Sequence, residues 1–155
     1  MIQSVPKILM LCLGNICRSP LAEGLLKSKV PFNKASIDSA GLDGWHEGEP
    51  PCESSRKIAK KHGLNIDNLR ARKFQINDFD RFDKIYIMDH LNLELIKKLA
   101  RNEKDLEKVD FIMNELYPGE NLDVPDSYQK GSGAAELVYK MLDQATDKIA
   151  QKLHE

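Results

Sequence analysis

The segment CLGNICRSP, from Cys12 to Pro20, joins two stretches of different character. The apolar run KILML (7–11) before it predicts a short buried strand. The run SPLAEGLLKSKV (19–30) after it predicts a helix, with Ser19 as N-cap and Pro20 in the first helical position. A strand that leads through a glycine-containing turn into a helix directs backbone N–H groups toward one point, where the helix N-terminus adds partial positive charge. The segment therefore predicts an anion-binding loop.

The rest of the chain continues this alternation of strands and helices. We expect further elements, in chain order, at 35–38 (strand), 52–62 (helix), 84–88 (strand), 91–100 (helix), 108–113 (strand) and 134–153 (helix). The order predicts an α/β fold: one domain over 1–155, with a four-stranded parallel twisted sheet and helices on both faces, in the flavodoxin-like or Rossmann-like three-layer arrangement. Ligands of such sheets bind at the carboxyl ends of the strands, where the first strand places Cys12.

Composition limits the function classes. The chain has 155 residues, 41% of them apolar and 30% charged, which suits one globular domain with its own core. A net charge of -1 argues against a nucleic-acid partner. The N-terminal apolar run is too short for a signal peptide or a membrane span, and the odd number of cysteines, three, argues against a disulfide framework. We expect a cytoplasmic protein with reduced thiols and no membrane partner.

Cys12 and Arg18 give the predicted loop its chemistry. Converging amides, a helix N-terminus and a guanidinium all favour the thiolate form of a cysteine. A planar guanidinium can bind two oxygens of a phosphoryl group at once. We therefore predict Cys12 as a nucleophile and Arg18 as the group that binds the phosphate and stabilises the transition state. A structural cysteine beside a surface arginine is the alternative, but the five-residue separation at a strand-to-helix turn favours catalysis.

The loop resembles the signature loop of the low-molecular-weight protein tyrosine phosphatases. Further matches follow in the order of that family: DSAG (38–41), EPP (49–51), KKHG (60–63), ARKF (71–74), IMDHLN (87–92) and VPDSY (124–128). The resemblance implies hydrolysis of phosphotyrosine through a phosphocysteine intermediate, without metal or organic cofactor. It also implies that Asp126 acts first as general acid and then as general base; a turn-forming role is the alternative. Ser127 replaces the usual proline of the family, and Gln129 stands where many members have tyrosine.

The resemblance also assigns supporting residues. The loop that binds phosphate would contain Leu13, Gly14, Asn15, Ile16, Cys17 and Ser19. Asn15 would adopt a left-handed conformation and join Ser19 and Ser39 in a hydrogen-bond network, and the Ser19 hydroxyl would donate to the Cys12 thiolate. The family often closes this network with a histidine at the position of Leu69, so the network here must end differently.

The family resemblance also implies which residues form the substrate slot and what roles the remaining cysteines have. Candidates for a slot that admits a phenyl ring are Leu13, Ile16, Trp45 and Tyr128, although Trp45 could equally be a half-buried loop aromatic. Cys17 would lie next to Cys12 and either form a reversible disulfide with it or serve as a packing residue. Cys52 is expected to have no partner and to be inert.

Three other functions are less consistent with the sequence. Arsenate reduction on a similar loop requires two further cysteines downstream, and no cysteine follows Cys52. Protein-arginine phosphatases of the same family usually have threonine at the position of Ile16, where a branched apolar side chain favours phosphotyrosine. A non-catalytic phosphate sensor would not need a nucleophile. The cysteines and histidines lack the spacing of a zinc site. Expected partners are phosphotyrosine proteins, with a tyrosine kinase as a candidate; the product is inorganic phosphate, and the chain is a monomer or weak dimer.

Overall fold

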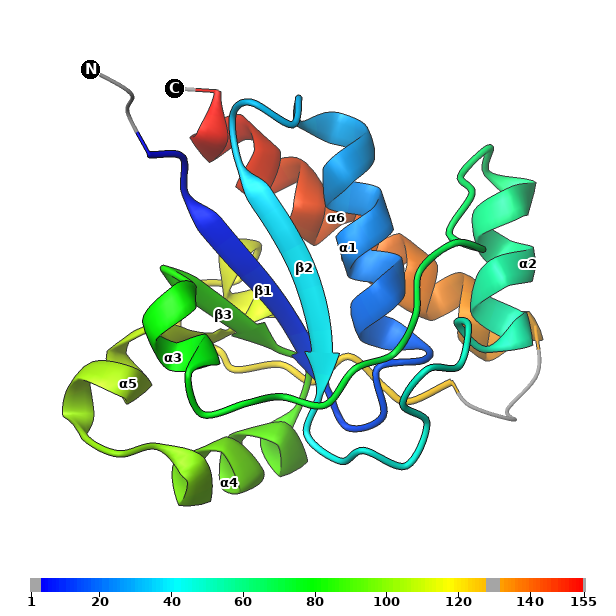
Figure 1. Ribbon diagram of the computed structural model, residues 1–155. Helices are drawn as coiled ribbons and strands as arrows, with labels where there is room; N and C mark the ends of the chain where they lie inside the picture. Colours follow the sequence, from blue (N-terminus) through cyan, green and yellow to red (C-terminus); the bar gives the residue numbers. More distant parts are fainter. Residues whose placement is uncertain (1–3, 128–131, 155) are drawn as a thin grey trace.

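The strand that precedes the predicted loop lies inside a four-stranded sheet. In the computed structural model, which describes residues 4–127 and 132–154, helices cover both faces of this sheet (Figure 1). In chain order the elements are β1 (Lys7–Cys12), α1 (Arg18–Lys29), β2 (Ser36–Gly41), α2 (Glu53–Lys61), α3 (Asp78–Arg81), β3 (Lys84–Ile87), α4 (His90–Leu99), α5 (Glu103–Glu107), β4 (Val109–Phe111), the 3-10 helix η1 (Ile112–Glu115) and α6 (Ser132–Leu153).

All strand pairs are parallel, and the strand order is β2-β1-β3-β4. The chain first moves from β1 to β2 on one side and then crosses to β3 on the other side. The carboxyl end of β1 is therefore the point where the strand order reverses, which is the usual ligand position in open α/β sheets. Cys12 is the last residue of β1 and pairs with Gly41 of β2. The predicted fold class is confirmed.

The two faces of β1 contribute to two separate cores. Ile8 and Met10 pack with α1, α2 and α6, while Leu9 and Leu11 pack with α3, α4 and β4. Figure 1 shows α1 and α6 on one side of the sheet and α3, α4 and α5 on the other. A strand that is buried on both faces is apolar at every position, which explains why the run before Cys12 does not alternate.

Several element boundaries differ from the sequence expectation. Helix α1 begins at Arg18 with Cys17 as its N-cap residue, so the prediction that Ser19 is the N-cap was wrong; the Ser19 hydroxyl contacts Cys12 instead. Strand β2 continues to Gly41 because it pairs with β1 along the whole length of that strand. The helices α3 and α5 were not predicted, since four and five residues are too few to show a helical period.

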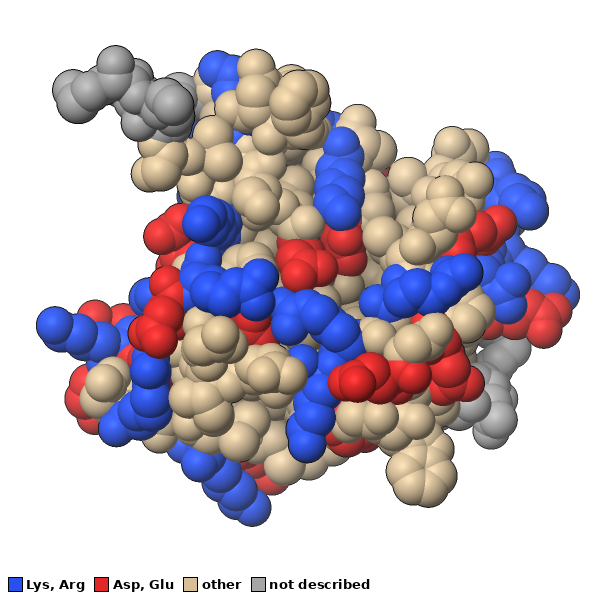
Figure 2. All heavy atoms as spheres, viewed as in Figure 1, with Lys and Arg blue, Asp and Glu red and all other residues tan. Residues whose placement is uncertain are grey.

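Charges on the surface are mixed. On the face shown in Figure 2, acidic and basic side chains are interspersed, in agreement with the near-neutral composition. Within 4–127 and 132–154, the helices include none with the length and apolar character needed to cross a membrane.

Gly24 provides a test of the packing of α1. A Cβ atom at this position would lie 2.4 Å from Cγ2 of the buried Ile66, so Gly24→Ala should destabilise the protein by about 1–3 kcal/mol. Gly133 of α6 is the matched control, because a Cβ there meets no heavy atom within 4 Å. Gly133→Ala should leave stability unchanged or raise it by up to about 1 kcal/mol. Urea unfolding midpoints measure both effects, and equal midpoints for the two variants would contradict this packing.

Candidate active site

The nucleophile candidate lies at the junction of β1 and α1. Cys12 is the last residue of the strand and is 3% exposed. Its Sγ lies 3.0 Å from Oγ of Ser19, which belongs to the first turn of α1. The hydroxyl can donate to a Cys12 thiolate and so stabilise the charged form, because hydrogen bonds to an ionised group are stronger than neutral ones.

Asn15 holds the turn between these two elements. Its backbone is left-handed, with φ 57°, which asparagine tolerates better than most residues. The side-chain Nδ2 donates to Ser19 Oγ (2.8 Å) and to Ser39 Oγ (2.9 Å), and Oδ1 accepts from the backbone N–H of Arg72 (2.9 Å). One buried amide thus joins the loop to α1, to β2 and to the segment that precedes α3.

The network continues beyond Ser39 to a buried carboxylate. Ser39 Oγ donates to Oε1 of Glu23 (2.5 Å), and Lys27 Nζ binds the other oxygen of Glu23 (2.5 Å). The Glu23–Lys27 pair therefore ends the network on α1, whereas Leu69 packs against the hydrophobic core. Glu23 was missed in the sequence because a Glu–Lys pair four residues apart on a helix usually lies on the surface.

Gly41 of β2 lies so close to the Cys12–Arg18 loop that a side chain at this position would collide with the loop backbone. A Cβ atom on Gly41 would lie 2.9 Å from the carbonyl carbon of Gly14 and 3.0 Å from the backbone nitrogen of Asn15. Gly41 also donates to the Arg72 carbonyl (2.8 Å) and accepts from the Phe74 N–H (2.7 Å). The loop can therefore pack against this position of β2 only because the residue there is glycine.

Arg18 is buried and held by one carboxylate. Its Nη1 donates to Asp89 Oδ2 (2.5 Å) and to the Val124 carbonyl (2.9 Å). Asp89 is in turn fixed as the N-cap of α4, because Oδ1 accepts from the Asn92 N–H (2.8 Å). Burial alone would lower the pKa of Arg18, but the charges of Cys12, Asp89 and Asp126 outweigh it and raise the pKa above its ordinary value. Asp89 was not singled out in the sequence, since nothing local connects it to Arg18.

A small pocket brings the three predicted catalytic residues together. Its volume is about 120 Å³, and its lining includes Cys12, Leu13, Gly14, Ile16, Cys17, Arg18, Asp43, His46 and Asp126. Asp43 and His46 were not predicted as lining residues. Trp45 is 86% exposed and is not among the residues that line this pocket. Tyr128 and Gln129 lie outside the described residues, so the place of Tyr128 in the slot stays a prediction.

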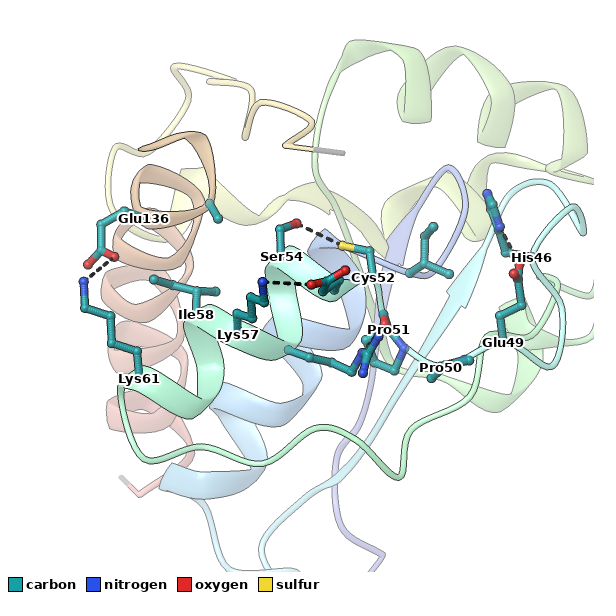
Figure 3. A pocket seen from close by; sticks show the side chains of 14 residues that line it. His46, Glu49, Pro50, Pro51, Cys52, Ser54, Lys57, Ile58, Lys61 and Glu136 are labelled. Atoms are coloured by element: carbon teal, nitrogen blue, oxygen red, sulfur yellow. Dashed lines mark hydrogen bonds and ion pairs between the residues drawn. The ribbon is translucent and has the colours of Figure 1, made fainter. Parts of the chain in front are cut away.

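A larger groove of about 690 Å³ opens beside the small pocket, and Ile16 and His46 line both. Figure 3 shows its floor and walls, formed by the Pro50–Pro51 stretch, by α2 and by Glu136 of α6. Ion pairs lie along the groove, from Lys57 to Glu53 (2.8 Å) and from Lys61 to Glu136 (3.2 Å). The reacting pocket is therefore flanked by a wide surface of mixed charge.

Two of the three cysteines are paired, which differs from the sequence expectation. Cys17 and Cys52 form a disulfide, with 5.3 Å between their Cα atoms, and Cys12 is a free thiol. The expectations that Cys52 has no partner and that all thiols are reduced were therefore wrong. The segment before α2 passes next to the loop, and the Cys52 N–H donates to the Ile16 carbonyl (2.6 Å). A count of cysteines cannot show this approach of two distant segments.

Comparison with known proteins agrees with this geometry. The sequence model of the family described as "Low molecular weight phosphotyrosine protein phosphatase" matches residues 7–155. The chain belongs to the low molecular weight phosphotyrosine protein phosphatase family. It is 36% identical to low molecular weight protein-tyrosine-phosphatase YfkJ of Bacillus subtilis over 129 residues, which cover 81% of this chain and 82% of that protein.

Solved structures of phosphatases also share the fold. A protein tyrosine phosphatase from Entamoeba histolytica, crystallised with Hepes in the active site, superimposes with a TM-score of 0.88 at 31% identity, over 96% of this chain and 97% of that one. Vibrio vulnificus Wzb in complex with benzylphosphonate gives a TM-score of 0.85 at 25% identity, over 96% and 99% of the two chains. The phosphatase loop of the present chain thus lies in the fold that these proteins use.

Asn15 allows its backbone conformation and its hydrogen bonds to be tested separately. Asn15→Gly keeps the left-handed backbone accessible but removes the side-chain bonds, while Asn15→Ala loses both. Both variants should unfold at lower urea concentration than wild type, and the alanine variant should be less stable than the glycine variant by about 1–2 kcal/mol. Equal free energies of unfolding for the two variants would contradict a left-handed backbone at position 15.

Proposed function

We propose that the protein hydrolyses phosphotyrosine monoesters through a phosphocysteine formed on Cys12. The observation that carries the proposal is that Cys12, Arg18 and Asp126 line one pocket although they come from distant parts of the chain. A nucleophile, a cation for the phosphoryl oxygens and a group for proton transfer are the three functions that this reaction requires. Membership of the family implies phosphoproteins as substrates.

In the first step the Cys12 thiolate attacks phosphorus, and the bond from phosphorus to the phenolic oxygen breaks. Asp126 in its protonated form gives its proton to the leaving oxygen. Arg18 has Nη1 engaged with Asp89 and Val124, and a guanidinium carries further N–H groups on Nε and Nη2. These two nitrogens are suited to bind two phosphoryl oxygens in the bidentate geometry that favours arginine over lysine.

In the second step the Asp126 carboxylate accepts a proton from water, which attacks phosphorus as the bond from sulfur to phosphorus breaks. Inorganic phosphate leaves, and Cys12 returns as thiolate. The Ser19 hydroxyl, 3.0 Å from Sγ, stabilises the departing sulfur by a hydrogen bond. The supporting network, Asn15, Ser39 and Glu23, positions this hydroxyl and does not itself exchange protons with the substrate.

Phosphotyrosine is favoured as the substrate by the apolar wall of the pocket. Leu13 and Ile16 line it, and Wzb, which shares the fold, binds a benzyl group that carries a phosphonate. We further propose that Trp45 and Tyr128 contribute to recognition around the ring. We also propose that the chain is one domain over 1–155 and acts in the cytoplasm as a monomer or weak dimer. Its proposed substrates are tyrosine-phosphorylated proteins, with a tyrosine kinase among them.

The mechanism predicts different effects for two catalytic variants. Cys12→Ser should abolish turnover of p-nitrophenyl phosphate and of phosphotyrosine peptides, in buffer with EDTA. Asp126→Ala should lower kcat by about 10²–10⁴ on phosphotyrosine peptides, the usual contribution of general acid–base catalysis. The loss should be smaller on p-nitrophenyl phosphate, whose leaving group is a weaker base. Phosphoarginine peptides serve as the comparison substrate, and preference for them would overturn the phosphotyrosine assignment.

The Asp89 contact predicts a smaller and separate effect. Asp89→Asn keeps the shape of the N-cap but removes the charge that orients Arg18. We expect kcat/KM to fall about 10-fold, since a hydrogen bond to a charged group contributes about 1.5 kcal/mol or more. Asp80→Asn is the matched control, because Asp80 pairs with Arg101 on the surface. Steady-state kinetics with p-nitrophenyl phosphate should show no change for the control; equal activity of both variants would contradict the positioning role.

A further inference from the structure

The disulfide between Cys17 and Cys52 lies next to the thiol that performs the proposed reaction. Cys17 lines the small pocket together with Cys12, and Cys52 lines the large groove. Cys17 is 4% exposed, whereas Cys52 is half-buried at the start of α2 (Figure 3). The three sulfur-bearing residues therefore form a series that leads from the reacting pocket to a surface that solutes can reach.

The two segments that carry the disulfide are joined by backbone contacts on either side of the sulfurs. The Cys52 N–H donates to the Ile16 carbonyl (2.6 Å), and Ser55 Oγ donates to the Cys17 carbonyl (3.0 Å). These bonds do not depend on the disulfide, so they can keep the two cysteines adjacent when both are reduced. The pairing is then rapid, because the reacting sulfurs are already held together.

The surroundings of Cys52 favour its thiolate. It is the N-cap residue of α2, a nine-residue helix whose N-terminus carries partial positive charge. The Ser54 hydroxyl lies 3.3 Å from Cys52 Sγ, where it can donate to a thiolate. Cys52 is thus suited to attack a neighbouring disulfide.

The disulfide form retains an assembled active site. With Cys17 and Cys52 joined, Cys12 remains a free thiol, its Sγ stays 3.0 Å from Ser19 Oγ, and the hydrogen bonds of Asn15 are in place. A disulfide between Cys12 and Cys17 would consume the nucleophile. The bond seen here leaves the nucleophile available.

We propose that Cys12, Cys17 and Cys52 form a thiol relay through which the protein reduces hydroperoxides and restores its own nucleophile. Cys12 is also the nucleophile of the proposed phosphatase reaction, but the relay is a second activity with its own readout. In the cytoplasm, which is the proposed location, disulfides are usually transient and serve catalysis or redox sensing.

The chemistry balances in three steps. The Cys12 thiolate attacks the hydroperoxide, which breaks the O–O bond and gives Cys12 sulfenic acid and an alkoxide or hydroxide. The Cys17 thiol then displaces water from the sulfenic acid and forms a Cys12–Cys17 disulfide. Finally the Cys52 thiolate attacks Cys17 Sγ, which releases Cys12 as thiolate and leaves the Cys17–Cys52 disulfide. The proton lost by Cys52 neutralises the alkoxide, and an external dithiol reductant later reduces the disulfide from the groove.

Peroxide titration with disulfide mapping tests the relay. The protein is reduced with dithiothreitol, desalted, treated with an equimolar amount of hydrogen peroxide, alkylated and mapped by mass spectrometry. Wild type should give the Cys17–Cys52 disulfide with Cys12 alkylated, and its phosphatase activity should be retained without added thiol. Cys52→Ser, which lies outside the catalytic machinery, should start with the activity of wild type, accumulate the Cys12–Cys17 disulfide and lose activity until dithiothreitol is added.

Two further variants separate the relay from simple oxidation. Cys12→Ser should lose the rapid formation of the Cys17–Cys52 disulfide, because this variant lacks the thiolate that reacts with peroxide. Cys17→Ser should leave Cys12 as sulfenic acid, which dimedone traps. If Cys12→Ser forms the disulfide as fast as wild type, or if wild type stops at the Cys12–Cys17 disulfide, the relay is overturned. Mass mapping needs no phosphatase activity, so failure of the proposed hydrolase function is distinguishable from failure of the relay.

Discussion

The hydrogen bonds of the Asn15 side chain hold together the turn on which the site depends. The chain has to turn between the end of β1 at Cys12 and the start of α1 at Arg18, and the left-handed backbone of Asn15 lies within this turn. Such a conformation persists only where surrounding contacts favour it. The amide of Asn15 provides them by binding α1, β2 and the Arg72 segment at once. The catalytic geometry is therefore a property of four segments that meet around one side chain.

Charge burial is the second constraint. Arg18 is 3% exposed and Glu23 is 3% exposed, and an unpaired charge in such a place is costly. Each has a partner of opposite charge: Asp89, which caps α4, pairs with Arg18, and Lys27, one turn along the same helix, pairs with Glu23. A carboxylate that fixes one edge of Arg18 also aligns its other edge for an anion. The interactions that make burial tolerable are thus the same ones that orient the site.

The cysteines show how the phosphatase fold can accommodate redox chemistry. The nucleophile must be a reactive thiolate to attack phosphorus, and the same property exposes it to oxidation. Cys17 lines the pocket of Cys12, and the segment before α2 brings Cys52 into bonding distance of Cys17 while the Ser19 contact stays in place. In the proposed relay, protection and catalysis share the same loop, because the Cys17–Cys52 disulfide leaves the nucleophile itself free.

The sequence by itself determined the α/β architecture and the strand-to-helix loop with Cys12 and Arg18, because these depend on local periodicity and on a motif of fixed spacing. The family resemblance, and no local pattern, pointed to Asp126. The same resemblance pointed to Asn15, Ser19 and Ser39. The short helices α3 and α5 lay below the length at which a helical period can be recognised. The roles of Asp89 and of the Cys17–Cys52 pair could not be predicted, since their partners lie far away in the chain. Glu23 could not be recognised as buried, because a Glu–Lys pair four residues apart, here with Lys27, resembles a surface pair. Only the tertiary structure decided these contacts, because the packing of helices on the sheet determines which distant side chains come within hydrogen-bonding or bonding distance.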